Sequence, residues 1–373
     1  MDKIKRFFEC LIPVTVCNLE CDYCYIIQHK QRHMNMAKLQ YEPKHIAQAL
    51  RKERVGGVCY FSICGAGETL IQNEVIEIVK LLLEEGHYVN ITTNGTLSNQ
   101  INKLISQCDN KEHLHMAFSL HYLELKRRDL LDTFFQNVEK VSKAGISYLV
   151  QMNLYDGYLS HLDEIKEICM EKVGAYPQIA VTRDEHSFPI KMHTDLSADE
   201  YYRYGAGFDS KLFEITFQNF NVKRSEFCYA GDWTGVLNLA NGWLQKCYQN
   251  KEGQNIFENI DKPIRFSAVG KYCNNAYCVN SSHFMSLGVI PSIETPTYAE
   301  LRDRENAGWY NEEMKHFLNS KLQESNQEYS NYKKFRSNTL SLFYRTKRYI
   351  RRFAEKNLPN RVKKLLLKQD IAR

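Results

Sequence analysis

Short runs of β-favouring residues alternate with helical patterns from the N-terminus to about residue 183. The expected strands are residues 11–15, 58–64, 88–93, 116–121, 148–153 and 178–182. Between them, residues 73–86 and 131–145 carry apolar side chains at helical spacing, and each is expected to be a helix. Successive βα units are typical of a parallel sheet, either doubly wound or part of a βα barrel.

Unusual residues gather where these expected strands end, and ligands of both fold types bind at the carboxyl ends of the strands. Cys17 follows the first strand, and Ser119 and His121 close the fourth. The second and third strands are followed by Gly65-Ala66-Gly67-Glu68 and by Asn94-Gly95. Four loops are therefore expected to meet at one rim.

The alternation stops past residue 190, and residues 228–289 hold short apolar pieces separated by glycines. Such a segment has little hydrophobic core of its own, and a structural metal site would stabilise it. We therefore expect a barrel-like core over residues 1–190, a connecting helical segment over 191–227, a small loop-rich domain over 228–295 and a helical, basic extension over 296–373.

The chain has twelve cysteines, no apolar run of about 20 residues and no apolar signal segment at its start. These features predict a cytoplasmic protein, in which thiols stay reduced and clustered cysteines bind metal or do chemistry. Two clusters are visible. They are Cys17, Cys21 and Cys24, and then Cys228, Cys247, Cys273 and Cys278.

The first cluster has the spacing C-x3-C-x2-C within one loop. Three close thiolates can hold three irons of a cubane cluster and leave the fourth iron without a protein ligand. A zinc site closed by His29 or His33 is the competing interpretation, because zinc binds four Cys or His groups at short spacings.

This loop, with Tyr23 before its last cysteine, resembles the hallmark of the radical S-adenosylmethionine (radical SAM) enzymes. Residues 64–70 look like the family's glycine-rich motif, although Ala66 and Thr69 stand where Gly and Pro are common. Residues 91–97 and 118–121 are similar to the family's third and fourth strand ends. The resemblance covers about the first 180 residues and implies an α/β fold, a partial (β/α)6 TIM-type barrel.

The resemblance also implies a chemistry. An iron–sulfur cluster (4Fe-4S) on Cys17, Cys21 and Cys24 would bind S-adenosylmethionine at its open iron and reduce it to methionine and a 5′-deoxyadenosyl radical, which takes a hydrogen atom from a substrate. The implied cofactor contacts are Tyr23, Gly65, Ala66, Gly67, Glu68, Asn94 and Ser119. Glu68 would accept from the amino group of the cofactor, and Asn94 and Ser119 suit ribose hydroxyls. Taken alone, the glycine segment and Asn94-Gly95 are also compatible with ordinary turns.

The expected partners are a one-electron donor such as flavodoxin or ferredoxin, and a substrate that is a peptide, a glycan or a small-molecule precursor. The competing class is a non-catalytic iron–sulfur or zinc protein that acts in electron transfer or as a scaffold. If a thiol returns hydrogen to the substrate, Cys64 at the mouth of its strand is the candidate.

The second cluster resembles the shortened "twitch" relative of the SPASM domain, which holds auxiliary iron–sulfur clusters. Four thiolates, those of Cys228, Cys247, Cys273 and Cys278, would complete one further 4Fe-4S cluster with no open position. A structural zinc satisfies the same four ligands. Asp232 lies nearby and is interpreted first as a turn residue or helix cap, and second as a proton acceptor for the substrate radical.

Residues 331–373 hold fourteen Lys or Arg against Glu355 and Asp370, a local charge of +12, so the remaining residues sum to −7. Apolar residues Leu340, Phe343, Ile350 and Phe353 recur among these cations. The pattern predicts an amphipathic helix that contacts anionic lipid, peripheral to the inner membrane face. A solvated helix with one stripe packed on the body is an alternative, and nucleic acid is a third although no binding motif accompanies the charge.

Overall fold

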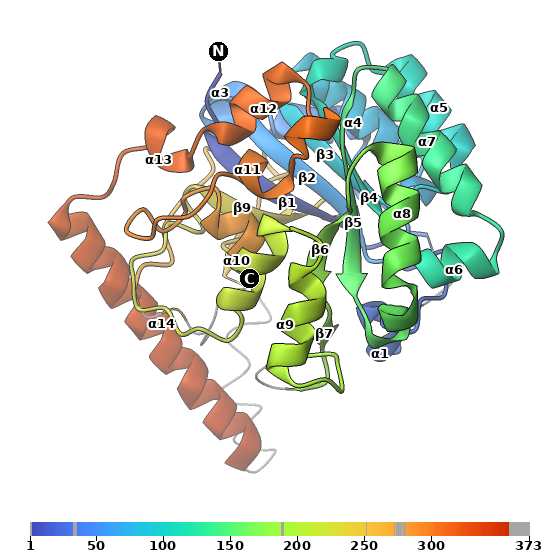
Figure 1. Cartoon of the computed structure of the whole chain (residues 1–373). Coiled ribbons are helices and arrows are strands. Elements are labelled where there is room, and N and C mark those ends of the chain that lie inside the picture. The colour runs from blue at the N-terminus through green and yellow to red at the C-terminus, as the bar shows by residue number, and fades with distance from the viewer. Residues whose placement is uncertain are drawn as a thin grey trace.

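The computed structural model describes residues 2–32, 36–187, 190–250, 252–271, 273, 278 and 281–357. Its centre is one twisted sheet with helices on both faces (Figure 1). His33, one of the two histidines considered as a zinc ligand, lies outside the described residues.

Six parallel strands run side by side in chain order. They are β1 (Arg6–Ile12), β2 (Cys59–Gly65), β3 (Tyr88–Thr93), β4 (Leu114–Ser119), β5 (Ser147–Leu154) and β6 (Gln178–Val181). The sheet is open, with β6 at one edge, which confirms the α/β fold of a partial barrel. The prediction for the first strand was wrong in position, because β1 begins at Arg6 rather than Leu11. Two charged residues, Arg6 and Glu9, interrupt its apolar pattern although both are buried.

Helices cover the outer face of this sheet. They are α2 (Pro43–Ala49), α3 (Lys52–Val55), α4 (Glu74–Glu84), α5 (Ser98–Gln107), α6 (Tyr122–Arg127), α7 (Leu131–Lys143) and α8 (Leu162–Val173). The two predicted helices are confirmed as α4 and α7. Phe118 of β4 meets Phe134 of α7 edge-on, with ring centroids 5.8 Å apart, so alternate strand residues face these helices. Short 3-10 turns are η1 (Thr69–Ile71), η2 (Lys111–His113) and η3 (Asp156–His161).

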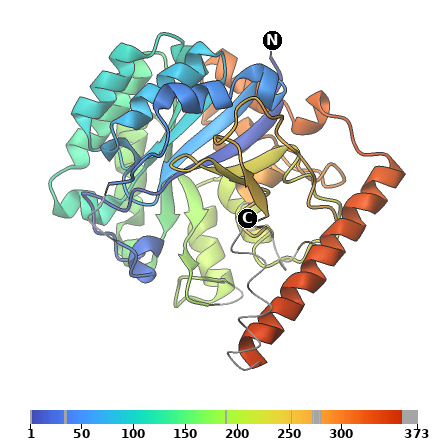
Figure 2. The ribbon, with the colours of Figure 1, turned by 180° about the vertical axis from the view of Figure 1, so that it is seen from behind.

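The segment expected as a loop-rich domain extends the same sheet. β9 (Thr234–Asn238) pairs in parallel with β1, and β10 (Trp243–Gln245) and β11 (Gly253–Asn255) follow antiparallel. Figure 2 shows these strands beside β1, with long loops around them. Before them come β7 (Arg183–Asp184), β8 (Lys191–Met192), α9 (Ala198–Ala206) and α10 (Lys211–Gln218).

C-terminal helices pack against the inner face of the sheet near the amino ends of its strands. They are α11 (Tyr298–Arg302) and α12 (Glu312–Asn319), joined by η5 (Glu305–Ala307) and preceded by η4 (Ser281–Met285). Tyr88 of β3 stacks on Phe317 of α12 with ring centroids 3.6 Å apart, and Tyr60 of β2 meets Tyr298 edge-on. The first part of the C-terminal extension therefore belongs to the core.

Toward the carboxyl ends, the inner face changes from buried to open. A buried polar row crosses the sheet through Glu9, Ser62, Asn90 and His115, which are neighbours in register. Beyond this row, part-exposed residues form an open layer. Leu11, Cys64 and Thr92 come next along their strands, and Ser119 pairs with Gln151 one step further along. This open layer lies next to the loops that carry the predicted site residues.

The described residues end with α13 (Leu322–Ser325) and the long helix α14 (Asn331–Asn357), drawn in red in Figure 1. Among the helices of the described residues, none combines the length and the apolar character needed to cross a lipid bilayer.

Candidate functional site

The three N-terminal cysteines lie in the loop between β1 and the short helix α1 (Tyr25–Gln28), at the carboxyl end of the sheet. Cys24 is the N-cap of α1, and its backbone N–H donates to the carbonyl of Cys21 at 3.0 Å. Burial, and then the nearby thiols of Cys17 and Cys24, raise the pKa of Cys21. A metal that binds here must therefore displace the thiol protons.

The glycine-rich turn packs directly on the chain that enters this loop. The N–H of Glu68 donates to the carbonyl of Val16 at 2.9 Å, and that of Gly67 donates to the carbonyl of Val14. A Cβ on Gly67 would lie 2.1 Å from the carbonyl oxygen of Val16. The close approach that requires glycine here is thus an approach of the turn to the protein's own backbone.

Glu68 anchors the ends of β2 and β3. Its carboxylate accepts from the Thr93 hydroxyl at 2.7 Å, from the N–H of Asn94 at 2.8 Å and from the N–H of Leu70 at 3.0 Å. Burial raises the pKa of Glu68, while these three hydrogen bonds lower it. The carboxylate therefore holds the turn and the third strand end together, in addition to any contact with a cofactor.

Asn94 continues this connection to the cysteine loop. Its side-chain N–H2 donates to Oδ1 of Asn18 at 2.8 Å and contacts Sγ of Cys17 at 3.8 Å, and its Oδ1 accepts from Thr96. Both side-chain donors of Asn94 thus point at the loop, which leaves none for a ribose in this arrangement. Ser119 is different, because its part-exposed hydroxyl has no hydrogen-bond partner among the described residues.

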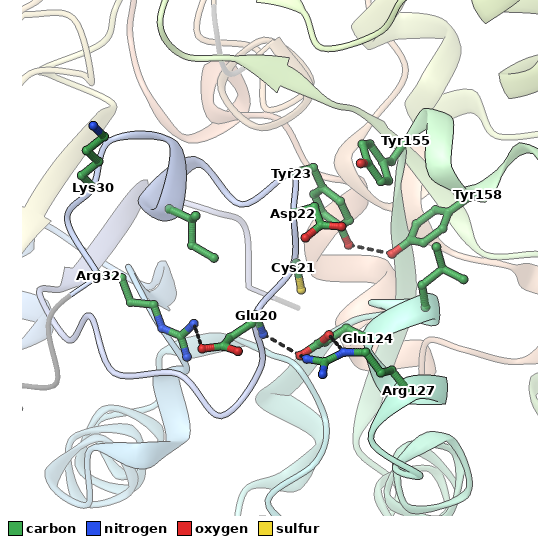
Figure 3. Close-up of a pocket in the computed structure, with 12 residues that line it drawn as sticks. Glu20, Cys21, Asp22, Tyr23, Lys30, Arg32, Glu124, Arg127, Tyr155 and Tyr158 are labelled. Carbon is green, nitrogen blue, oxygen red and sulfur yellow. Dashed lines mark hydrogen bonds and ion pairs between the residues drawn. The ribbon is translucent and has the colours of Figure 1, made fainter.

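A cavity of about 800 Å³ opens beside the loop, with Cys21 and Tyr23 in its wall (Figure 3). The Tyr23 hydroxyl lies 2.9 Å from that of Tyr158 and 2.7 Å from Nδ1 of His121. Burial lowers the pKa of His121 to about 4, so its imidazole is neutral near pH 7. This buried chain of hydrogen bonds fixes the ring of Tyr23 between two of the predicted cysteine ligands.

Charged side chains form the rim of the cavity in pairs. Arg32 lies 2.8 Å from Glu20, and Arg127 lies 2.8 Å from Glu124, which also accepts from the backbone N–H of Glu20. The hydrogen bond from the Glu20 N–H to Glu124 attaches the cysteine loop to α6.

Comparison with known proteins identifies the domain that carries this loop. Residues 11–169 match the family model described as the radical SAM superfamily. The chain contains a radical SAM domain. Members of this superfamily use S-adenosylmethionine and a 4Fe-4S cluster. A search of the curated proteins finds no match.

Solved structures with a similar fold include Streptococcus suis SuiB bound to S-adenosylmethionine. It has 16% identity and a TM-score of 0.51, with 69% of this chain and 65% of that chain covered. S. suis SuiB bound to the precursor peptide SuiA gives 18% identity and a TM-score of 0.50, covering 69% and 64%. Hexahistidine-tagged anSMEcpe with bound AdoMet has 16% identity and a TM-score of 0.47, with 68% of this chain and 78% of that chain covered. The chain thus spans just under two thirds of the SuiB chain, and the likeness supports the fold of the radical SAM domain.

The donor set in the loop of the radical SAM domain fits an iron–sulfur cluster. Three thiols share one loop, and the sulfur of Cys17 accepts from the N–H of Leu19 at 3.4 Å as well as from Asn94. Such hydrogen bonds are typical of cluster-ligating thiolates. In the part of the chain that the structure describes, no three Cys, His, Asp or Glu side chains already form a compact metal site, so the fit is one of donor chemistry and placement.

The second cysteine set also comes together. Cys228, Cys247, Cys273 and Cys278 line one cavity of about 60 Å³, whose other walls include Val269, Phe284 and Ile290. Burial raises the pKa of Cys247 to about 11, with Cys273 as the next cause. Four thiols in an apolar cavity suit a cluster or a zinc ion with no open position.

Asp232, close to this set in sequence, has a structural role. Its carboxylate pairs with Arg6 of β1 at 3.5 Å and accepts from the Tyr329 hydroxyl at 2.5 Å. Of the two interpretations of Asp232, the contacts favour the structural one.

Sequence reasoning missed the buried charged groups beneath the open layer. Glu9 accepts from the thiol of Cys64 at 3.3 Å, and burial raises the pKa of Glu9 to about 7. Arg302 is buried on α11, and one of its nitrogens has no partner among the described residues, as is also true of Oε2 of Glu9. A charged residue inside a hydrophobic strand, as Glu9 is, was the available signal.

Proposed function

We propose that this chain is a radical SAM enzyme that reductively cleaves S-adenosylmethionine and abstracts a hydrogen atom from a substrate. The observation that carries the proposal is the C-x3-C-x2-C loop, packed on the glycine-rich turn at the carboxyl end of the sheet. When bound, a cluster with one open iron supplies the electron that splits the cofactor into methionine and a 5′-deoxyadenosyl radical.

The residues of the chain have separate tasks in this proposal. Cys17, Cys21 and Cys24 hold the cluster, and Glu68 and Asn94 fix the loop that presents them. Further cofactor contacts are proposed at residues on the same rim, namely Tyr23, Gly65, Ala66, Gly67 and Ser119. Placement in a partly enclosed site protects a radical from water and competing hydrogen donors.

We assign the second cysteine set to one auxiliary 4Fe-4S cluster. The support is the shared cavity of Cys228, Cys247, Cys273 and Cys278, which leaves four sulfur ligands and no open position. Such a cluster suits electron transfer with the substrate or a scaffold for the substrate side of the site.

For the substrate we propose a peptide, with a glycan or small-molecule precursor as the second class. The support is fold similarity with S. suis SuiB, which was solved bound to the precursor peptide SuiA. A one-electron donor such as flavodoxin or ferredoxin would complete the reaction.

Cofactor cleavage tests the proposal directly. Anaerobically reconstituted protein is mixed with dithionite and S-adenosylmethionine, and 5′-deoxyadenosine is measured. The parent should release it, Cys21→Ala should not, and Cys169→Ala, which removes a buried thiol of α8, should behave as the parent does. A cluster-loaded parent that releases none, or equal release by Cys21→Ala, would contradict the assignment.

Iron counting tests the auxiliary cluster separately. Two cubanes require about eight irons per chain, whereas one cubane with zinc requires about four. Cys273→Ala should lose about half of the iron and retain at least part of the cleavage activity. A parent that holds about four irons and one zinc would refute the auxiliary cluster and leave the first proposal intact.

A further inference from the structure

The long helix α14 is attached to the body by small polar side chains. The Ser337 hydroxyl donates to the carbonyl of Ala268 at 3.1 Å, and Oδ1 of Asn338 accepts from the N–H of Lys271 at 2.9 Å. Ser341, one turn further, donates to the carbonyl of Val269. The stripe that α14 packs on the body is therefore polar, which is the reverse of an amphipathic helix docked on its own core.

Large apolar side chains of the same helix remain exposed. Tyr332 is 76% exposed, Phe335 is 69% exposed, and Leu342 is half exposed. Their spacing of three and ten residues from Tyr332 places all three on one face. Ten large hydrophobic side chains are exposed in the described residues, and five of them are on the first thirteen residues of α14.

The body leaves most of this apolar face in solvent. Figures 1 and 2, which view the molecule from opposite sides, both show α14 extending past the sheet and its covering helices. The sequence continues the spacing with Ile350 and Phe353, eight and eleven residues after Leu342. At Tyr332 and Phe335 the apolar face is thus largely uncovered.

Charge identifies the kind of surface that would cover it. Residues 331–357 hold nine Lys or Arg and one acidic residue, Glu355, while the whole chain carries only +5, so the rest of the chain is net acidic. An exposed apolar stripe flanked by cations is the pattern of helices that lie in the interface of an anionic bilayer. Nucleic acid would require the cations but gives no reason for exposed Phe and Leu side chains.

We propose that α14 is a membrane-docking helix that lies flat on anionic lipid, with Tyr332, Phe335 and Leu342 among the acyl chains and its cations at the headgroups. The body would remain attached to the lipid-bound helix through the polar contacts of Ser337 and Asn338. This proposal does not depend on the proposed activity.

Vesicle co-sedimentation of the full, cluster-loaded chain tests it. The probes are phosphatidylglycerol–phosphatidylcholine vesicles and pure phosphatidylcholine vesicles. The parent should prefer the anionic vesicles, and added salt should weaken its binding. The double variant Phe335→Ser with Leu342→Ser should partition about tenfold less or weaker still, because two exposed apolar side chains no longer enter the acyl region.

A matched control replaces two exposed side chains on the body, Met170→Ser with Tyr204→Ser, and should bind vesicles as the parent does. Iron content and the thermal midpoint should be unchanged in both double variants, since all four side chains are exposed. Three outcomes would each overturn the proposal. They are equal binding to both vesicle types, equal binding by the parent and the α14 variant, and a self-associated parent that the α14 variant converts to monomer. Tighter binding to duplex DNA than to anionic vesicles, unaffected by the two changes on α14, would also overturn it in favour of nucleic acid.

Discussion

The side chain of Asn94 connects the end of β3 to the cysteine loop. Its two N–H groups reach Asn18 and the sulfur of Cys17, and its own backbone N–H is held by the buried carboxylate of Glu68. The chain Glu68, Asn94, Cys17 therefore acts as a strut between the glycine-rich turn and one cluster ligand. This arrangement gives Asn94 a positioning role toward the cluster.

Asn94→Ala should lower the reduction potential of the N-terminal cluster. Hydrogen bonds to ligand sulfurs stabilise the more negative, reduced state, so losing one favours the oxidised state. A bond of ordinary strength changes the ratio of reduced to oxidised cluster by up to about tenfold, or about 59 mV for one electron. The measurement is a redox titration followed by electron paramagnetic resonance, in a Cys273→Ala background that removes the auxiliary signal.

Asn102→Ala, at an exposed position of α5, is the matched control and should leave the potential unchanged. A midpoint in Asn94→Ala equal to that of the parent would show that the Asn94 contact has no electronic role. A parent with no reducible cluster would instead count against the proposed function.

Glu9 makes the stability of the protein depend on pH. Burial raises the pKa of Glu9 from 4.5 to about 7, so the unfolded chain ionises first as pH rises. The protonated carboxyl contributes its full share to the free energy of unfolding below pH 4.5. This contribution falls as pH rises and is lost by about pH 7, which lowers the free energy of unfolding by about 3 kcal/mol. Glu9→Gln should therefore gain a few degrees in thermal midpoint over the parent at pH 8, and little at pH 5.

Glu167→Gln, on the exposed side of α8, should show no such pH-dependent gain. If the thermal midpoints of Glu9→Gln and the parent differed by the same amount at pH 5 and pH 8, the pKa of Glu9 would not be raised and the prediction would be wrong.

At the scale of elements, the glycine-rich turn after β2 and the cysteine loop after β1 form one packed unit. Gly67→Ala should displace the loop, because the new Cβ would lie 2.1 Å from the carbonyl oxygen of Val16. Backbone rather than a flexible side chain would have to move, so we expect the variant to lose most of its N-terminal cluster. Iron content and 5′-deoxyadenosine release measure this.

Ala66→Gly, at the preceding position of the same turn, removes a Cβ instead of adding one and should keep both readouts near those of the parent. Normal iron content in Gly67→Ala would mean that the loop relaxes without cost, against the observed packing.

These local elements were also the part of the fold that sequence patterns predict well. The strands β2 to β6 and helices α4 and α7 have regular spacing, and the cysteine loop is defined by residues only a few positions apart. β1 was misplaced because its Arg6 and Glu9 are compensated by Asp232 and Cys64, residues far away in sequence. Contacts of that kind leave no periodic signal.

For the same reason, the hydrogen-bond partners of the predicted site residues could not be predicted from the sequence. Spacing suggested that Glu68 and Asn94 stand at one rim, but not that they bond to each other and to the loop. The polar contacts of α14 with the body could likewise not be predicted, because the sequence of the helix does not determine which of its faces packs on the body.

At the scale of the whole molecule, the chain beyond residue 295 has two parts that differ in how they pack. α11 and α12 fill the inner face of the sheet, where Phe317 is fully buried against Tyr88. α14 leaves Tyr332 and Phe335 largely in solvent. The boundary between core and appendage therefore lies after α13 and not at the start of the C-terminal extension.

A pair of identical substitutions tests this division. Phe317→Ala opens a cavity beneath β3 and should cost about 3–5 kcal/mol, whereas Phe335→Ala should stay within about 0.5 kcal/mol of the parent. Thermal unfolding of the cluster-loaded protein measures the loss of stability in both variants. Only Phe317→Ala should also release cluster iron at a lower temperature, because this substitution loosens the sheet that carries the cysteine loop. Equal midpoints for the two variants would place α12 outside the core, and a large loss in Phe335→Ala would show that the face assigned to lipid is already covered by the protein itself.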